Sequence, residues 1–143
     1  MRIVLDTIVL VAGLMSRNGA SHQILRGIAL DVVDFVVSVP LFLEYEDVLK
    51  RPSFVRQTGL SAKDIEMVLD LLAANGHQTP LDFMWRPQLR DADDEMVLEA
   101  ATNGGAAAIV TFNQRDFLPA ATTFGLRVIT PGDYLPSIRG KLQ

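Results

Sequence analysis

The chain of 143 residues has the length of one ordinary domain, and it is long enough to bury a core without disulfides or metal staples. It has no cysteine, which excludes disulfides, thiolate metal sites and a cysteine nucleophile, and its 2 histidines argue against a His-rich zinc site. Its net charge of −4 argues against a polycation that binds nucleic acid over its whole surface. The longest apolar run near the start, residues 8–15, is too short to span a bilayer, so we expect a cytoplasmic, single-domain protein over 1–143.

The apolar pattern predicts the secondary structure in chain order. It comprises a strand over 2–5, helices over 8–15 and 20–30, a strand over 35–39, helices over 41–50, 61–75 and 91–103, strands over 107–111 and 126–129, and a short last helix from Pro131. Residues 77–90 are expected to form a connection with room for a short edge strand, and 113–117 a loop. Short apolar strands that alternate with helices predict an α/β fold with a mostly parallel sheet.

Polar residues follow two of the predicted strands. In open α/β sheets, ligands bind beyond the carboxyl ends of the strands, so the residues that end strands are candidates for a site. Asp6 ends the first strand, and Thr111 ends the third, with Asn113 and Asp116 shortly after it. If these strands are neighbours, two carboxylates and an amide meet at one edge. Each residue alone also has a structural interpretation, as a helix cap or a turn residue.

Two predicted helices carry further acids on or beside their apolar faces. Asp94 shares a face with the apolar residues 97, 98 and 101, and a charge there costs free energy unless it is paired or bound to a metal. Asp91 is most simply the N-cap of the same helix. In the helix over 41–50, Glu44 and Glu46 lie on opposite flanks of the apolar stripe, and the helical wheel does not choose between them.

Considered together, these acids predict a particular chemistry. A group of carboxylates without His or Cys is an oxygen-ligand site, which suits Mg²⁺ or Mn²⁺. Uncompensated carboxylates repel one another and some protonate, and a divalent ion resolves that repulsion. One or two such ions can activate a water and stabilise the leaving oxygen of a phosphodiester.

Several blocks of the sequence resemble those of PIN domains, in order and with similar spacing. The opening, residues 2–10, is similar to their usual start, an apolar strand followed by Asp, Thr, Asn, Val and Leu. Further similar blocks span residues 38–52, 90–101 and 109–117, and the closing segment 129–135 also fits. The resemblance covers nearly the whole chain and implies a three-layer α/β/α sandwich with a mostly parallel central sheet.

The resemblance also implies a function and its partners. PIN domains of this kind are metal-dependent endoribonucleases that hydrolyse single-stranded RNA with Mg²⁺ or Mn²⁺. Many small bacterial members are toxins that a small antitoxin protein holds inactive, and a homodimer is a further implication.

Carried over position by position, the resemblance assigns roles to residues of this chain. It implies an acidic catalytic pocket, and thereby selects Glu44 over Glu46. The pocket consists of Asp6, Glu44, Asp94 and Asp116. The metal would be held by Asp6, Asp94 and Asp116. Supporting roles fall to Asp91, Thr111 and Asn113.

One position departs from the family pattern. PIN domains usually carry Asn two residues after the first Asp, and this chain has Ile8 there. Changes beside metal ligands commonly cost about 10–100-fold in metal affinity or activity. The alternative to a ribonuclease is therefore a catalytically weak or inactive PIN scaffold that binds RNA or a protein partner.

An RNA substrate needs local positive charge on a chain that is negative overall. Arginine forks suit phosphates, and the candidates are Arg17, Arg51, Arg56, Arg86, Arg90 and Arg115. Each of them also has the ordinary interpretation of a solvated or ion-paired surface residue. The aromatic side chains are expected to pack in the core or in loops rather than to form a platform on which bases stack.

Overall fold

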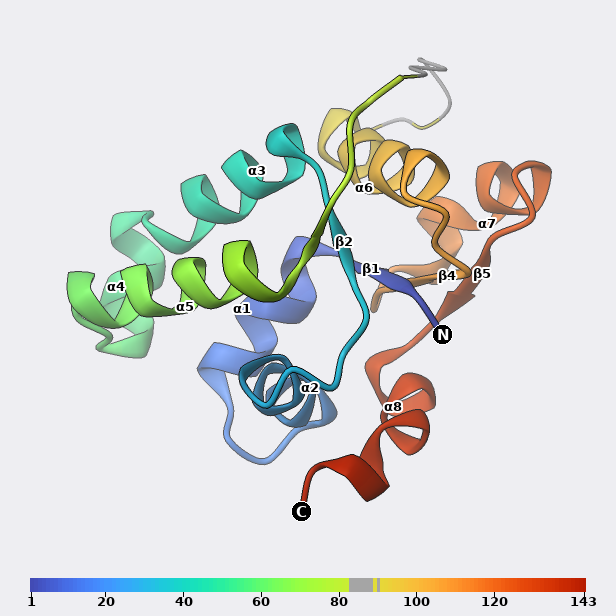
Figure 1. Ribbon diagram of the computed structural model, residues 1–143. Coiled ribbons are helices and arrows are strands. Elements are labelled where there is room, and N and C mark those ends of the chain that lie inside the picture. Colours follow the sequence, from blue (N-terminus) through green and yellow to red (C-terminus); the bar gives the residue numbers. More distant parts are fainter. Residues whose placement is uncertain (83–88, 90) are drawn as a thin grey trace.

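The computed structural model describes residues 1–82, 89 and 91–143. Its strands are β1 (Ile3–Leu5), β2 (Val36–Val37), β3 (His77–Gln78), β4 (Ala108–Val110) and β5 (Arg127–Ile129). Three of them pair in the order β1-β4-β5, all parallel, and β2 pairs with β3, also parallel (Figure 1). A parallel bridge between Ile3 and Phe35 joins the two groups. The spatial order is therefore β3-β2-β1-β4-β5, which confirms the predicted α/β fold with a mostly parallel sheet.

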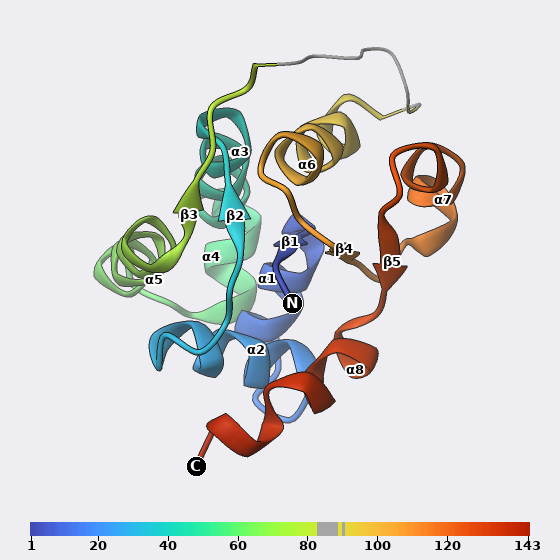
Figure 2. The same cartoon turned by 45° about the vertical axis from the view of Figure 1, so that its right-hand side comes forward.

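Helices surround these strands. In chain order they are α1 (Thr7–Met15), α2 (Ala20–Ala29), α3 (Val39–Leu49), α4 (Pro52–Thr58), α5 (Ala62–Asn75), α6 (Ala92–Asn103), α7 (Gln114–Thr123) and α8 (Pro131–Tyr134). Two short 3-10 turns follow, Leu135–Ser137 and Arg139–Lys141. In Figure 2, α6 lies above the strands and α2 and α8 lie below them. All side chains of β1 and β4 are buried, as their unbroken apolar runs predict.

The second strand is shorter than predicted, because a helix begins where the strand was expected to continue. The Ser38 hydroxyl accepts the Leu41 backbone N–H at 3.2 Å and so caps α3. Pro40 sits in the first turn, where its missing N–H costs no helical hydrogen bond. The predicted edge strand in the segment after Asn75 is present as β3.

Two helices were not predicted. Pro52 opens α4 and Gly59 ends it with a left-handed φ of 71°, and Phe54 between them is buried. The expected loop over 113–117 is wrong, since α7 begins at Gln114 and continues through Pro119. Proline argues against a helix in the sequence, but the buried apolar face of α7 outweighs its cost.

The strand order places a site on the sheet. From β1 the chain moves outward in one direction to β2 and β3, and in the other direction to β4 and β5. The switch point therefore lies between β1 and β4, and ligands of open α/β sheets bind beyond the carboxyl ends of the strands at such a point. The residues that follow β1 and β4 are Asp6 and Thr111.

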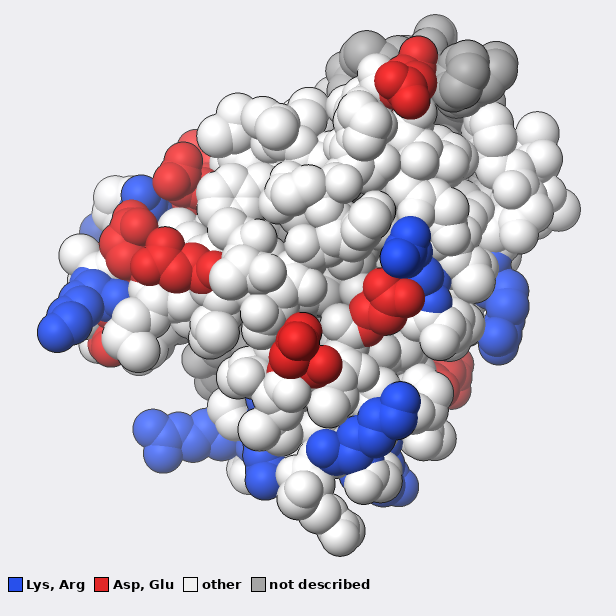
Figure 3. All heavy atoms as spheres, viewed as in Figure 1, with Lys and Arg blue, Asp and Glu red and all other residues white. Residues whose placement is uncertain are grey.

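The exterior carries charges of both signs. On the face seen in Figure 3, most charged side chains of the described residues lie in the lower half and at the left. In the part of the chain that the structure describes, no helix is long and apolar enough to cross a membrane.

Candidate active site

Asp6 is fixed at the junction between β1 and α1. Its backbone N–H donates to the Val110 carbonyl of β4 at 3.0 Å, and its own carbonyl accepts the Val9 N–H at 2.9 Å in the first turn of α1. The residue is only 6% exposed, so its carboxylate lies within the protein at the switch point. The backbone on both sides therefore holds this carboxylate in place.

Thr111, at the end of β4, holds the Asp6 carboxylate from the neighbouring strand. Its hydroxyl donates to Asp6 Oδ2 at 2.7 Å, and the hydroxyl oxygen accepts the backbone N–H of Asn113 at 2.9 Å. The Thr111 backbone N–H donates in turn to the Ile129 carbonyl at 2.9 Å. This chain of bonds supports the role expected of Thr111, whereas Asn113 contributes its backbone rather than its side-chain amide.

The pKa of Asp6 is raised above its ordinary value, chiefly because burial disfavours the charged carboxylate. The Thr111 hydroxyl and the Thr7 backbone N–H lower it in part. The charges of Asp116 and Asp91 raise it further. Acids from the starts of α6 and α7 therefore act on the carboxylate that ends β1.

Asp94 is the most strongly perturbed of the predicted site residues. It lies half-buried in the first turn of α6, and burial raises its pKa to about 7. The charges of Asp6, Asp91, Asp116 and Asp93 raise it too, in that order. The structure thus brings Asp6, Asp94 and Asp116 into one electrostatic field, as carboxylates at a shared site would be.

Asp91 has a structural role that accounts for its position. Its carboxylate accepts the Asp93 backbone N–H at 2.9 Å and caps α6, which confirms the interpretation as an N-cap. Its charge also raises the pKa values of Asp6, Asp94 and Glu44.

Glu44 and Glu46 are distinguished by their surroundings. Burial raises the pKa of Glu44, and the charges of Asp93, Asp47 and Asp91 add to that, while Arg51 opposes it. Glu46 instead pairs with Lys50 at 3.2 Å, one turn along α3. Of the two glutamates, Glu44 is therefore the one whose pKa responds to the acids at the start of α6.

Tyr45 was not predicted as part of this region. The residue is fully buried, and its phenol donates to the Leu5 carbonyl at the end of β1. Burial and the charge of Asp6 raise its pKa, so the phenol stays protonated and remains a donor. This bond ties α3, and with it Glu44, to the strand that carries Asp6.

Asp116 and Asn113 lie at the exposed start of α7. The Asp116 backbone N–H donates to the Asn113 carbonyl at 3.0 Å, and both side chains are exposed. Asn113 is the N-cap residue, but its side chain makes no capping hydrogen bond. Both side chains thus remain accessible to solvent at the carboxyl end of β4.

α6 also buries two acids that were not predicted. Glu95 and Glu99 are 4% and 2% exposed, and they lie one turn apart. Glu95 accepts the Leu89 backbone N–H at 2.6 Å, so it holds the chain just ahead of α6. These glutamates therefore have a role in the fold that the charge pattern alone did not indicate.

The fit of this site to a divalent ion rests on its donor chemistry. Carboxylate and hydroxyl oxygens are the ligands that Mg²⁺ and Mn²⁺ prefer, and the mutual repulsion of the acids favours a cation between them. Within the described residues, no three His, Cys, Asp or Glu side chains are already grouped to hold an ion. The side chains therefore suit a hard cation by their chemical type and charge. Among the described residues, they are not already arranged around one point as a set of ligands.

The arginines proposed for phosphate binding have different surroundings. Arg51 pairs with Asp47 at 2.8 Å, and its guanidinium also acts on Glu44 and Asp93. Arg17, Arg56 and Arg115 are exposed, and Arg115 precedes Asp116. Arg86 and Arg90 lie outside the described residues. Of these arginines, Arg51 is therefore the one for which the described part of the chain shows an electrostatic interaction with Glu44.

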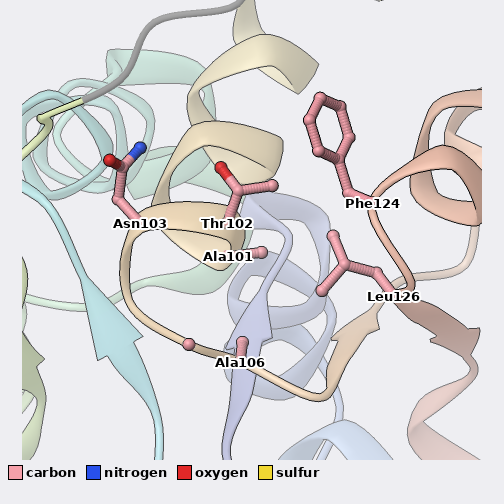
Figure 4. A pocket seen from close by; sticks show the side chains of 7 residues that line it. Ala101, Thr102, Asn103, Ala106, Phe124 and Leu126 are labelled. Atoms are coloured by element: carbon pink, nitrogen blue, oxygen red, sulfur yellow. The ribbon is translucent and has the colours of Figure 1, made fainter.

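A pocket of about 350 Å³ lies at the other end of the sheet. Its wall runs from the end of α6 through Ala106 to Phe124 and Leu126 (Figure 4). Ala106 precedes β4, so the pocket lies at the amino edge of the strands and is separate from the acidic group. In Figure 4 the Asn103 side chain points away from Phe124 and Leu126.

The structure thus places acidic side chains at the switch point of a mostly parallel α/β sheet, beside its first strand. In a comparison with descriptions of known families, residues 2–115 of the chain match the one described as "PIN domain". The chain therefore belongs to the PIN domain family, whose members are generally nucleases and typically use divalent metals. No curated protein matches the chain.

The Asp94→Asn variant is expected to be more stable than the natural chain at neutral pH without metal. A carboxyl whose pKa rises from 3.8 to about 7 on folding contributes stability below pH 3.8 that is lost as the pH rises toward 7. The amide carries no charge, so the gain at pH 8 should be about 1–2 kcal/mol after allowance for solvent screening. Thermal melts in EDTA between pH 3 and pH 8 measure it.

Asp70→Asn, at an exposed position of α5, is the control for this experiment. In the natural chain, Mn²⁺ should raise the melting temperature by binding the folded state, and it should do so less in Asp94→Asn. A stability difference that stays constant over the whole pH range would contradict the expected role of the Asp94 charge.

Proposed function

We propose that this PIN domain is a metal-dependent endoribonuclease that hydrolyses phosphodiester bonds of single-stranded RNA. The observation that supports it most is the raised pKa of Asp94, caused first by burial and then by the charges of nearby acids that include Asp6 and Asp116. Titratable groups with perturbed pKa values cluster at functional sites. The proposed cofactor is Mg²⁺ or Mn²⁺.

In this proposal, Asp6, Asp94 and Asp116 hold the cation, and Glu44 completes the pocket by orienting the attacking water. When bound, such an ion lowers the pKa of water and stabilises charge on the phosphate and the leaving oxygen. Thr111 keeps the Asp6 carboxylate in position through its 2.7 Å hydrogen bond.

Arg51 is the proposed phosphate contact beside the pocket. Its ion pair with Asp47 is exposed and therefore weak, so a phosphate oxygen can replace the Asp47 carboxylate at little cost. Arg17, Arg86, Arg90 and Arg115 remain proposed phosphate contacts.

A cleavage assay tests the function directly. Purified protein is incubated with labelled single-stranded RNA in Mn²⁺, in Mg²⁺ and in EDTA. Cleavage is expected with either ion and not in EDTA. Glu44→Gln should lower the rate strongly, whereas Glu46→Gln should leave it unchanged, because Glu46 is engaged with Lys50. Equal effects of the two substitutions would contradict the assigned pocket.

A second candidate function is a PIN scaffold that binds RNA or a protein without cleaving. The observation that favours it is Ile8, an aliphatic side chain 41% exposed and two residues from Asp6, where PIN domains usually carry Asn. Calorimetry with Mn²⁺ separates the two functions. A catalytic pocket binds the ion and loses affinity in Asp94→Asn, whereas a scaffold shows neither effect.

The biological setting we propose is that of a cytoplasmic toxin, held inactive by a small antitoxin protein and acting as a homodimer. The support is the small size of the chain together with its membership of the family. Expression in bacteria should arrest growth, and co-expression of the protein encoded by the neighbouring reading frame should relieve the arrest.

A further inference from the structure

Phe112 differs from the aromatic residues that form the core. Its side chain is 50% exposed, whereas Phe35, Phe54 and Phe117 are buried. Phe112 therefore lies outside the core, in the short turn between β4 and α7. An exposed aromatic ring offers a flat surface on which a base can stack.

The position of Phe112 is fixed by the site itself. It stands between Thr111, which donates to Asp6, and Asn113, whose backbone N–H returns to the Thr111 hydroxyl. The helix α7 begins immediately afterwards, at Gln114. Phe112 thus lies in a short turn that begins at Thr111, which is bonded to Asp6, and ends where α7 begins.

Other exposed apolar side chains stand beside the acids in the sequence. Ile8 is 41% exposed and follows Asp6 by two residues, and Leu43 is 54% exposed and precedes Glu44. A nucleic acid strand offers matching chemistry, since its phosphates suit a cation among the carboxylates and its bases have flat apolar faces.

We propose that Phe112 is a base-stacking residue that selects unpaired nucleic acid by holding one base beside the scissile phosphate. The proposal rests on the proposed nuclease function and adds the means of substrate selection. Stacking on an aromatic ring tolerates every base, because every base has a π-face. In a duplex both faces of a base are already covered, so the ring discriminates against paired strands.

Binding of RNA in EDTA tests stacking separately from cleavage. A fluorescein-labelled single-stranded RNA is titrated at low salt, and its anisotropy is recorded for the natural chain, Phe112→Ala, Phe112→Leu and Phe112→Trp. We expect Phe112→Ala and Phe112→Leu to bind roughly 5- to 150-fold more weakly. Phe112→Trp should bind at least as well as the natural chain. Leu30→Ala, 49% exposed and at the end of α2, is the matched control and should change nothing.

A second readout reports the stacking itself. RNA with 2-aminopurine at successive positions should show quenched fluorescence at one position, and Phe112→Leu should abolish the quenching. Leucine keeps the apolar bulk but not the ring, so a hydrophobic contact of another kind would survive it. Far-UV circular dichroism and thermal melts confirm that each variant folds.

The outcomes separate this proposal from the nuclease function. Phe112-dependent binding without cleavage in Mn²⁺ would support stacking and contradict the nuclease. Metal-dependent cleavage with RNA affinity unchanged in Phe112→Ala would overturn stacking alone and indicate that the ring serves another purpose, such as a protein contact. Equal affinity for single-stranded and duplex RNA, or no RNA binding by the natural chain, would also overturn the proposal.

Discussion

The Asp6→Asn variant is expected to fold like the natural chain and to reduce RNA cleavage in Mn²⁺ to the level seen in EDTA. The amide has the shape of the carboxylate, and its oxygen can still accept the Thr111 hydroxyl bond that now measures 2.7 Å. What it loses is the negative charge that a divalent ion requires at the centre of the site. Gel assays of labelled RNA measure the loss, and circular dichroism checks the fold.

The control for Asp6→Asn must remove a carboxylate of the same type far from the switch point. Asp34→Asn does so, because Asp34 pairs with Arg2 at 3.1 Å, and its backbone carbonyl bonds to Ile3 at the amino end of β1. This variant should cleave at the natural rate. Cleavage at the natural rate by Asp6→Asn as well would exclude Asp6 from the machinery and with it the proposed site.

The parts of the fold predicted from the sequence are those that depend on local patterns. Buried strands appear as short apolar runs, and a polar residue that interrupts such a run marks the strand end, as at Asp6 and Thr111. The sequence predicts that these ends meet only if the two strands are neighbours, and the observed order β1-β4-β5 supplies that condition. The same local signals located the cap at Asp91.

The features that were missed depend on contacts between distant residues. Tyr45 looks like any apolar position of a helix, and only the packed fold reveals its phenol bonded to Leu5 across 40 residues. α7 carries a proline that argues against a helix, and burial of Phe117 overrides it. The sequence likewise does not show that Phe112 lies exposed outside the core.

Glu44 and Glu46 are a further case in which the sequence alone could not assign a role and contacts between elements could. The helical wheel places them on opposite flanks of one stripe and cannot choose. The structure distinguishes their surroundings. The Lys50 ammonium forms an ion pair with Glu46. Burial raises the pKa of Glu44, and the charges of acids at the start of α6 raise it further. The chemistry of a residue on a helix flank therefore depends on which element packs against that flank.

The Ile8→Asn variant is expected to gain activity. Ile8 lies in the first turn of α1, 41% exposed, two residues after Asp6, and PIN domains usually carry Asn at this position. An amide there can donate to a carboxylate or orient a water, and groups of this kind beside metal ligands are worth about 10–100-fold in affinity or activity. We expect an increase of that size in kcat/KM for RNA cleavage and in Mn²⁺ affinity by calorimetry.

Ile8→Ala is the matched control, because it removes the same aliphatic side chain without supplying an amide. If the gain arises from the amide, Ile8→Asn alone shows it, and adding Asp6→Asn cancels it. If Ile8→Ala gains as much, the aliphatic side chain acts by obstructing the site. If neither variant gains activity while both bind RNA as the natural chain does, the chain is a scaffold that kept its acids for structure, and the amide usual in the family has no partner here to orient.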